Sequence, residues 1–273
     1  MNAPLRALAA AGLLFAASCA SLPASHVAGP PAIDVVREQL LQDDLGTRTV
    51  RGVARLAFEG PQGSGSASQV VVVALPDRAR VEALTPLGTT ALVVTLRADE
   101  IRVHSVLRGE YGVGRASPQT LERLLKISVP PELFLRLLAG LPPLPVRAED
   151  PRFSVVPEEA AVRVESTDGV YWQRMWTEAD EPGVARGEVG RAAEVLFTFA
   201  FADRQPTDGR RFPFEVRVEE PATHSRVRVR YERVQLNLPA DSDLFELPPP
   251  ADSRTRIIDL GGVTTPRGES PRD

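Results

Sequence analysis

The amino-acid sequence predicts a mainly β protein, in which about eleven strands form one antiparallel, strongly curved half-barrel sheet with an N-terminal helix and two inserted lid helices. Apolar and polar residues alternate along most of the 273-residue chain, as they do in strands with one buried face. The turns between these segments are short, which favours antiparallel neighbours. A helical period occurs only near the N-terminus and in two adjacent segments midway along the chain. A closed ligand-binding barrel is the near alternative.

The N-terminal residues 1–18 have the layout of a secretory signal peptide. Arg6 precedes an apolar run that is shorter than the roughly 20 apolar residues a membrane-spanning helix needs. Cys19 is the only cysteine of the chain, and it follows the small residues Ala17 and Ser18. This arrangement resembles the lipobox of bacterial lipoproteins, which implies that the signal is removed and that Cys19 is acylated. A secreted protein with a free thiol, or an uncleaved signal, is the alternative.

The segment over residues 19–31 is rich in proline and is expected to act as a lipidated tether. In bacterial lipoproteins, an Asp directly after the acylated Cys commonly retains the protein in the inner membrane. Ala20 stands at that position here. The resemblance therefore implies anchoring in the outer membrane, on the side that faces the periplasm.

The overall charge is mildly acidic, with a formal net value of −4 at pH 7. Proteins that bind nucleic acid usually carry a strongly basic surface, because the phosphate backbone dominates the affinity. We therefore expect no nucleic-acid partner. We also expect contact with membranes through acyl chains and not through a polybasic patch.

Residues 32–247 are expected to form one domain, followed by a disordered tail over residues 248–273. A first helix is predicted over residues 32–45, because its apolar residues share one face. The strands are predicted over residues 50–60, 68–75, 79–84, 90–96, 100–107, 153–157, 161–166, 169–177, 194–201, 211–220 and 225–239. In the last of these the apolar positions change parity between Tyr231 and Val234, which indicates a β-bulge. Residues 177–195 are interpreted as a long hairpin connection.

The two midway helices carry clear end signals. Ser117 is a typical N-cap, and Pro118 occupies the first helical position. The second helix lies in "PPELFLRLLAGLPPLP" and is expected to end at Gly140, with prolines beyond it. These two helices interrupt the run of strands and are the natural cover for a curved sheet.

The stretch "LTPLGTTALVV" resembles a signature of the LolB-like outer-membrane lipoprotein receptor family, in which two strands flank a Pro-Leu-Gly turn. "VRGVARLAF" resembles the first strand of that family, and "FLRLLAGLPPLP" resembles its lid helix. The resemblance covers roughly residues 33–240. It implies a half-barrel whose apolar cavity accepts lipoprotein acyl chains from a periplasmic carrier protein. It also implies insertion of the cargo into outer-membrane lipid by a monomeric protein.

The Pro-Leu-Gly turn consists of Pro86, Leu87 and Gly88. In the family, the protruding leucine of this turn acts in delivering lipid to the membrane, and Leu87 occupies that position. Proline fixes φ before the tip and glycine permits the sharp exit from the turn. The alternative is that Leu87 folds back onto the rim of the sheet.

The candidate cavity residues fall into two groups. Four apolar residues on the predicted lid helices form the first group: Leu121, Leu124, Phe134 and Leu138. Strand alternation supplies aromatic rows as the second group: Trp172 with Trp176, then Phe197 with Phe199 and Phe201, and Phe212 with Phe214. Such rows are more often ordinary core than a ligand wall. The ligand wall is favoured by a curved sheet whose apolar concave face is larger than two short helices can fill.

A catalytic function, a cofactor and a metal site are not expected. His26, His104 and His224 are scattered along the chain, and the sequence has no Gly-x-Ser-x-Gly elbow and no metal-ligand spacing. The main alternative to a lipoprotein receptor is a lipid-anchored binding or assembly module that uses the same fold for another amphiphile or a protein partner.

Overall fold

The computed structural model describes residues 31–145, 153–158, 161–178 and 181–261. The predicted signal peptide, the predicted acylation site Cys19 and nearly all of the predicted tether lie outside the described residues. The structure therefore concerns the predicted domain and the segment that follows it.

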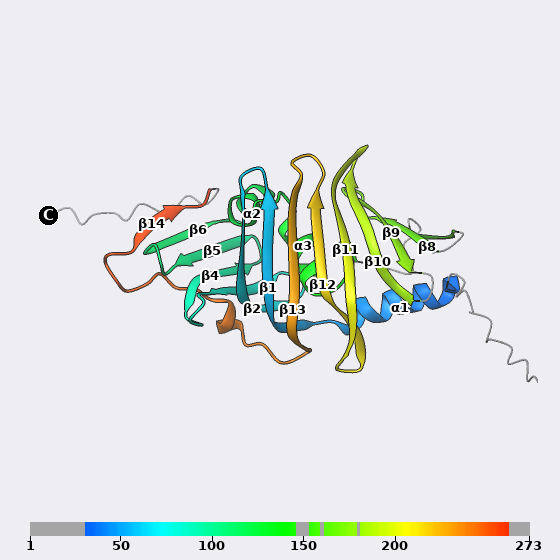
Figure 1. Ribbon diagram of the computed structural model, residues 1–273, viewed down its shortest axis with the longest axis horizontal. Helices are drawn as coiled ribbons and strands as arrows, with labels where there is room; N and C mark the ends of the chain where they lie inside the picture. Colours follow the sequence, from blue (N-terminus) through cyan, green and yellow to red (C-terminus); the bar gives the residue numbers. More distant parts are fainter. Residues whose placement is uncertain (1–30, 146–152, 159–160, 179–180, 262–273) are drawn as a thin grey trace, which may run out of the picture.

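One sheet of 14 strands makes up most of the molecule (Figure 1). The strands follow one another in the order β14-β6-β5-β4-β3-β2-β1-β13-β12-β11-β10-β9-β8-β7. Their bounds are β1 (Thr49–Gly60), β2 (Gly63–Ala74), β3 (Arg78–Leu84), β4 (Thr90–Arg97), β5 (Glu100–Ser105), β6 (Glu110–Arg115), β7 (Ser154–Pro157), β8 (Val162–Thr167), β9 (Trp172–Glu178), β10 (Glu181–Arg191), β11 (Glu194–Thr207), β12 (Arg210–Glu220), β13 (Ser225–Leu236) and β14 (Arg256–Asp259). Neighbouring strands are antiparallel, except for β14, which pairs with β6 in parallel. Within the described residues the sheet is open, with β14 and β7 at its two ends.

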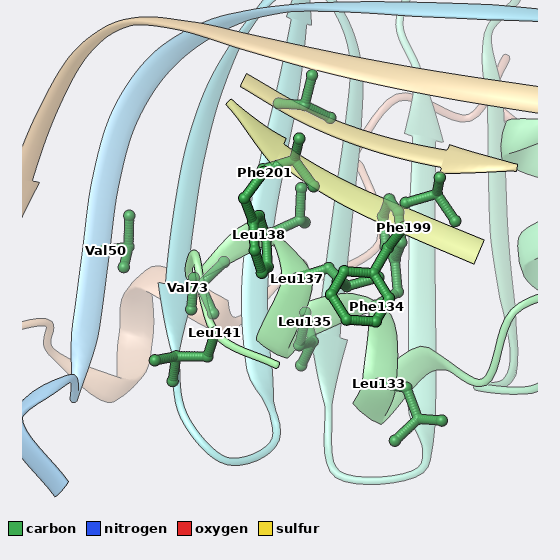
Figure 2. Close-up of a cluster of buried hydrophobic side chains, with 14 of the residues drawn as sticks. Val50, Val73, Leu133, Phe134, Leu135, Leu137, Leu138, Leu141, Phe199 and Phe201 are labelled. Carbon is green, nitrogen blue, oxygen red and sulfur yellow. The ribbon is translucent and has the colours of Figure 1, made fainter. Parts of the chain in front are cut away.

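Three α-helices of the described residues accompany the sheet: α1 (Ile33–Gly46), α2 (Pro118–Leu125) and α3 (Pro131–Leu138). The main hydrophobic cluster joins α3 to one face of the sheet, which we call the concave face. Figure 2 shows Phe134 and Leu138 of α3 in the same cluster as Phe199 and Phe201 of β11. The α1 helix contacts β10 and β7, and its Val36 and Leu40 belong to the same main cluster.

The predicted helix ends are confirmed. The backbone N–H of Thr120 donates to Ser117 Oγ at 3.2 Å, so Ser117 caps α2. Gly140, with φ of +71°, follows the end of α3, where a left-handed conformation suits glycine. The predicted bulge is also confirmed, because Tyr231 pairs with Ala54 and Arg233 pairs with Val53, which leaves one extra residue between them.

The prediction of about eleven strands is wrong, because β6, β10 and β14 were not predicted. The strand β10 lies inside residues 177–195, which the sequence suggested to be a connection. The strand β14 lies inside residues 248–273, so the prediction of a fully disordered tail is also wrong. The part of that tail after residue 261 lies outside the described residues.

Glycines explain why two of these strands carry a weak sequence signal. A Cβ at Gly187 of β10 would lie 2.6 Å from the ring of Phe199. A Cβ at Gly114 of β6 would lie 2.6 Å from Leu260 Cβ. Neighbouring side chains thus occupy the space that a side chain on these strands would need, and glycine lowers the apparent strand propensity.

The C-terminal segment, residues 238–261, crosses the opposite (convex) face and then turns to the edge of the sheet; we call it the strap (Figure 1). Phe245 of the short helix η1 (Ser242–Phe245) packs against Val72 and Ala74. The hydroxyl of Tyr111 donates to the Leu247 carbonyl at 2.7 Å. The strap then adds β14 to the edge of the sheet and buries Leu260.

Candidate lipid-binding site

An apolar cavity of about 90 Å³ lies between the concave face and the two short helices. Its sheet-side wall comes mostly from small and aliphatic residues of β1 to β5. Those residues are Leu56, Gln69, Val71, Ala79, Val81, Ala83, Leu92, Val94, Leu96 and Ile101, together with Val229 of β13. The lining residues include no charged side chain. The site can therefore hold hydrocarbon, but it offers no group for acid–base chemistry.

All four predicted lid residues line this cavity. Leu121 and Leu124 come from α2, and Phe134 and Leu138 come from α3. The spacing of these residues along each helix places them on the face that meets the sheet. Leu121 and Phe134 are only 7% and 5% exposed, so these two side chains are buried between the helices and the sheet.

The predicted phenylalanine rows are buried core and do not line the cavity. Phe197 is fully buried, and the rings of Phe199 and Phe201 pack with their centroids 5.4 Å apart. Phe212 packs against Tyr231 at the same centroid distance, 5.4 Å, and next to Phe214. These rings fill the space between α3 and the β10–β13 half of the sheet, so the core alternative describes them.

Trp172 and Trp176 do not lie on the concave face, so the prediction that they form a ligand wall is wrong. Gln173 and Met175 are the buried residues of β9, and the tryptophans alternate with them. The indole of Trp176 donates to Glu158 Oε2 at 3.2 Å. The Arg174 guanidinium lies 4.8 Å from the centre of the Trp172 ring. Alternation pairs the two tryptophans correctly, but it does not say which face is concave.

Gln69 is the one polar residue that lines the cavity, and it is not among the residues predicted for the site. It lies on β2 in the same alternating row as Val71 and Val73. The residue is 8% exposed, and its Oε1 has no hydrogen-bond donor among the described residues. The spacing of two residues between Gln69, Val71 and Val73 was the one sequence feature that placed Gln69 on the buried face.

A largely buried ion pair holds α3 against α1. Arg136 pairs with Asp44, and its Nε donates to the Pro142 carbonyl at 2.8 Å. Burial lowers the pKa of the Arg136 guanidinium, while the Asp44 carboxylate opposes this shift. The ion pair fixes the outer side of α3 and leaves its apolar side on the cavity.

The Pro-Leu-Gly turn lies between β3 and β4 and projects from the sheet. Thr85 and Thr89 close the turn, because the Thr85 backbone N–H donates to the Thr89 carbonyl at 2.8 Å. Gly88 has φ of +80°, as a tight exit requires. Leu87 is 92% exposed, so it does not fold back onto the rim.

A second apolar tip lies at the same end of the sheet. Strands β3, β4, β5 and β6 are consecutive and antiparallel, so the β3–β4 and β5–β6 turns share one end. Leu107 in the β5–β6 turn is 73% exposed. The backbone N–H of Val106 donates to the Ala91 carbonyl at 3.0 Å, which fixes this turn beside the start of β4.

Within the described residues, no helix is long and apolar enough to cross a membrane, and no cluster of metal-ligating side chains is present. Neither a protein-family model nor a curated protein matches the sequence.

Solved structures do share the fold. A DUF1329 family protein from Desulfovibrio piger matches with a TM-score of 0.53 at 12% identity, over 80% of this chain and 98% of that chain. A LolA superfamily protein from Nitrosomonas europaea matches with a TM-score of 0.52 at 11% identity, over 79% of this chain and 98% of that chain. The curved sheet with its covering helices is therefore a LolA/LolB-type fold. At these identities the likeness shows the fold alone.

Proposed function

We propose that this protein binds the acyl chains of lipoproteins in the cavity under α2 and α3, and passes them from a periplasmic carrier protein into the outer membrane. The observation that carries the proposal is a wall of aliphatic side chains with no charge, closed by two short helices. Its fold is shared with a LolA superfamily protein, which supports a role in lipoprotein handling. The proposed activity is binding and transfer by a monomer, without catalysis.

The free energy of exposing an acyl chain to water explains why its transfer needs an apolar cavity. An acyl chain of about sixteen carbons hides some 12 kcal/mol of hydrophobic free energy, at roughly 0.8 kcal/mol per methylene. Release of such a chain into water is therefore negligible. A receptor that uses no external energy needs only a few kcal/mol of differential affinity between the carrier, its own cavity and the bilayer.

The cavity has to expand before it can take a whole chain. Its volume of about 90 Å³ is below the roughly 300–1,000 Å³ typical of ligand pockets. The sheet wall is continuous and hydrogen-bonded, whereas α2 and α3 have eight residues each. Outward movement of these helices is the simplest way to open the site.

The proposed delivery step uses the exposed tip. Leu87 gains about 2 kcal/mol by leaving water for the membrane interior. This amount is too small to anchor a protein, but it is enough to orient one that is already held through acylated Cys19. The proposed location is the periplasmic face of the outer membrane.

A transfer assay tests the proposal. The chain with Cys19→Ser is incubated with carrier loaded with a triacylated lipoprotein, and transfer is followed by co-purification. We expect transfer to the parent chain, and loss of transfer in Ala83→Phe, which fills the cavity. Ala57→Phe is the matched control, because it enlarges a residue on the other face of β1, next to Leu56.

The alternative outcomes separate the candidate functions. If no lipoprotein moves to the parent chain, the receptor function is contradicted. Binding of a free acyl probe under the same conditions would then favour a module for another amphiphile on the same fold.

A further inference from the structure

Gln69 places an unpaired polar atom inside an otherwise apolar cavity. Its side chain is 8% exposed, and Oε1 accepts no hydrogen bond from the described residues. A buried amide oxygen without a donor is unfavourable, and native proteins contain few of them. An unsatisfied group of this kind calls for an explanation.

The second buried glutamine on the concave side shows what a structural amide looks like in this fold. Gln173 is 1% exposed, and its Oε1 accepts from the Leu144 backbone N–H at 3.0 Å. Its Nε2 donates to the Leu144 carbonyl at 3.1 Å and to Ser166 Oγ at 2.8 Å. Gln173 therefore holds the Leu144 loop against β8 and β9. Gln69 Oε1 has no comparable role.

The surroundings of Gln69 leave room for a ligand group. Its partners across the sheet are Ala54 on β1 and Ala83 on β3, both small residues. Ala83 pairs with Leu92 close to the Leu87 turn, so Gln69 lies toward the end of the cavity that is nearest this turn. The wall continues from Ala83 to Ala79 over about 13 Å of strand, and this part is aliphatic.

We propose that Gln69 is a specificity-determining residue whose Oε1 accepts a hydrogen bond from a donor near the polar end of a bound acyl chain. The donor is an amide N–H of an N-acylated group or a hydroxyl on the chain, and the hydrocarbon continues toward Ala79. This inference rests on the proposed function, because it requires that an acyl chain occupies the cavity. A chain without a donor leaves Oε1 unpaired, so we expect a preference of about tenfold for donor-bearing chains.

Two matched pairs of probes test this preference by titration calorimetry on the chain with Cys19→Ser. N-palmitoylglycine and N-palmitoylsarcosine differ in the amide N–H, which a methyl group replaces in the second. β-Hydroxypalmitic acid and palmitic acid differ in one hydroxyl. We expect the donor-bearing member of one pair to bind about tenfold more tightly, and the pair that shows this preference identifies the source of the donor.

The variant Gln69→Met has nearly the same shape and no amide. We expect its affinity ratio in the discriminating pair to fall to about one. Thermal unfolding checks that it folds: Gln69→Met keeps or raises the Tm, whereas Gln173→Met lowers it, because only Gln173 loses hydrogen bonds.

The outcomes are distinguishable. Equal binding within both pairs by the parent chain overturns the role of Gln69 and leaves the proposed function intact; this is also the result if a water molecule pairs with Oε1. A preference that persists in Gln69→Met overturns it as well. Failure of all four probes to bind contradicts the proposed function itself.

Discussion

Arg123 of α2 donates a hydrogen bond from Nη1 to the backbone carbonyl of Leu260 at 2.8 Å, and so joins a lid helix to the strap. The side chain of Leu260 is buried in a cluster that also contains Leu124 of α2. Opening of the cavity by movement of α2 therefore has to break contacts with the C-terminal segment. The strap therefore contributes to the free energy that the proposed opening would cost.

Removing the packing of the Leu260 side chain against α2 should loosen this helix specifically. We expect Leu260→Ala to cost about 2 kcal/mol of local stability, because it removes a buried side chain. Hydrogen exchange of the α2 amides should then accelerate about tenfold or more, with little change in β11 and β12. Ile257→Ala, three residues earlier in the strap, is the control, since Ile257 is 61% exposed. Equal acceleration in both variants would show that α2 is not held by Leu260.

Gly187 should be intolerant of a side chain although it lies in a strand. Its added Cβ would lie 2.6 Å from the Phe199 ring and 2.7 Å from the Arg174 carbonyl oxygen. We expect Gly187→Ala to lower the free energy of unfolding by about 1–3 kcal/mol in denaturant titration. Adding Phe199→Leu should restore part of this loss, because it removes one of the two clashes. Strictly additive effects would contradict the proposed clash.

Glu215 should make the protein sensitive to acid. Its side chain is 3% exposed, and it accepts hydrogen bonds from Arg228 at 2.8 Å and from Arg217 at 2.5 Å. Burial raises the pKa of Glu215, but the two arginines outweigh burial and hold the pKa below its ordinary value of 4.5. The unfolded state then binds more protons, so the stabilisation is complete above pH 4.5 and is lost as the pH falls through the lowered pKa.

The measurement is the free energy of unfolding as a function of pH. We expect the acid-dependent loss from this residue to be about 1 kcal/mol, because the arginines are half-exposed and solvent screens them. Glu215→Gln should be less stable at neutral pH and should show a flatter acid profile. A profile with the same slope as that of the parent chain would assign the acid sensitivity to other groups.

The two apolar tips should act together at a membrane. We expect Leu87→Glu to keep binding of acyl probes but to slow delivery of lipoprotein to liposomes, at a cost of about 2 kcal/mol. Leu107→Glu should have a similar but smaller effect, since Leu107 is less exposed than Leu87. Val170→Glu, at the β8–β9 turn, is the matched control because Val170 is also an exposed apolar residue. Equal delivery by all variants would remove the role assigned to Leu87.

Much of the fold could be predicted from local pattern alone. The first part of β1 alternates regularly, β13 alternates up to its bulge, and the Ser117 cap marks the start of α2. Two of the three strands that were not predicted, β6 and β10, have glycines where a neighbour packs closely, as Leu260 does on Gly114. These strands are defined by contacts with residues far away in the sequence, so the pattern of neighbouring residues does not reveal them.

The candidate site was predictable in part for the same reason. Helical spacing was enough to place Leu121 and Phe134 on the cavity, because an amphipathic helix has one apolar side. Strand alternation did not separate the concave from the convex side, so Trp172 was assigned to the wrong face. Gln69 was not predicted as a site residue because it directly precedes a run of valines. A polar residue in that position usually marks the solvent-exposed start of a strand.

With the exception of Val229, every residue that lines the cavity lies between positions 56 and 138, in one unbroken piece of the polypeptide. The later strands supply backing for that piece and contribute almost nothing to the lining surface. If the cavity binds acyl chains as proposed, the surface they contact is encoded almost entirely by this one continuous stretch of sequence.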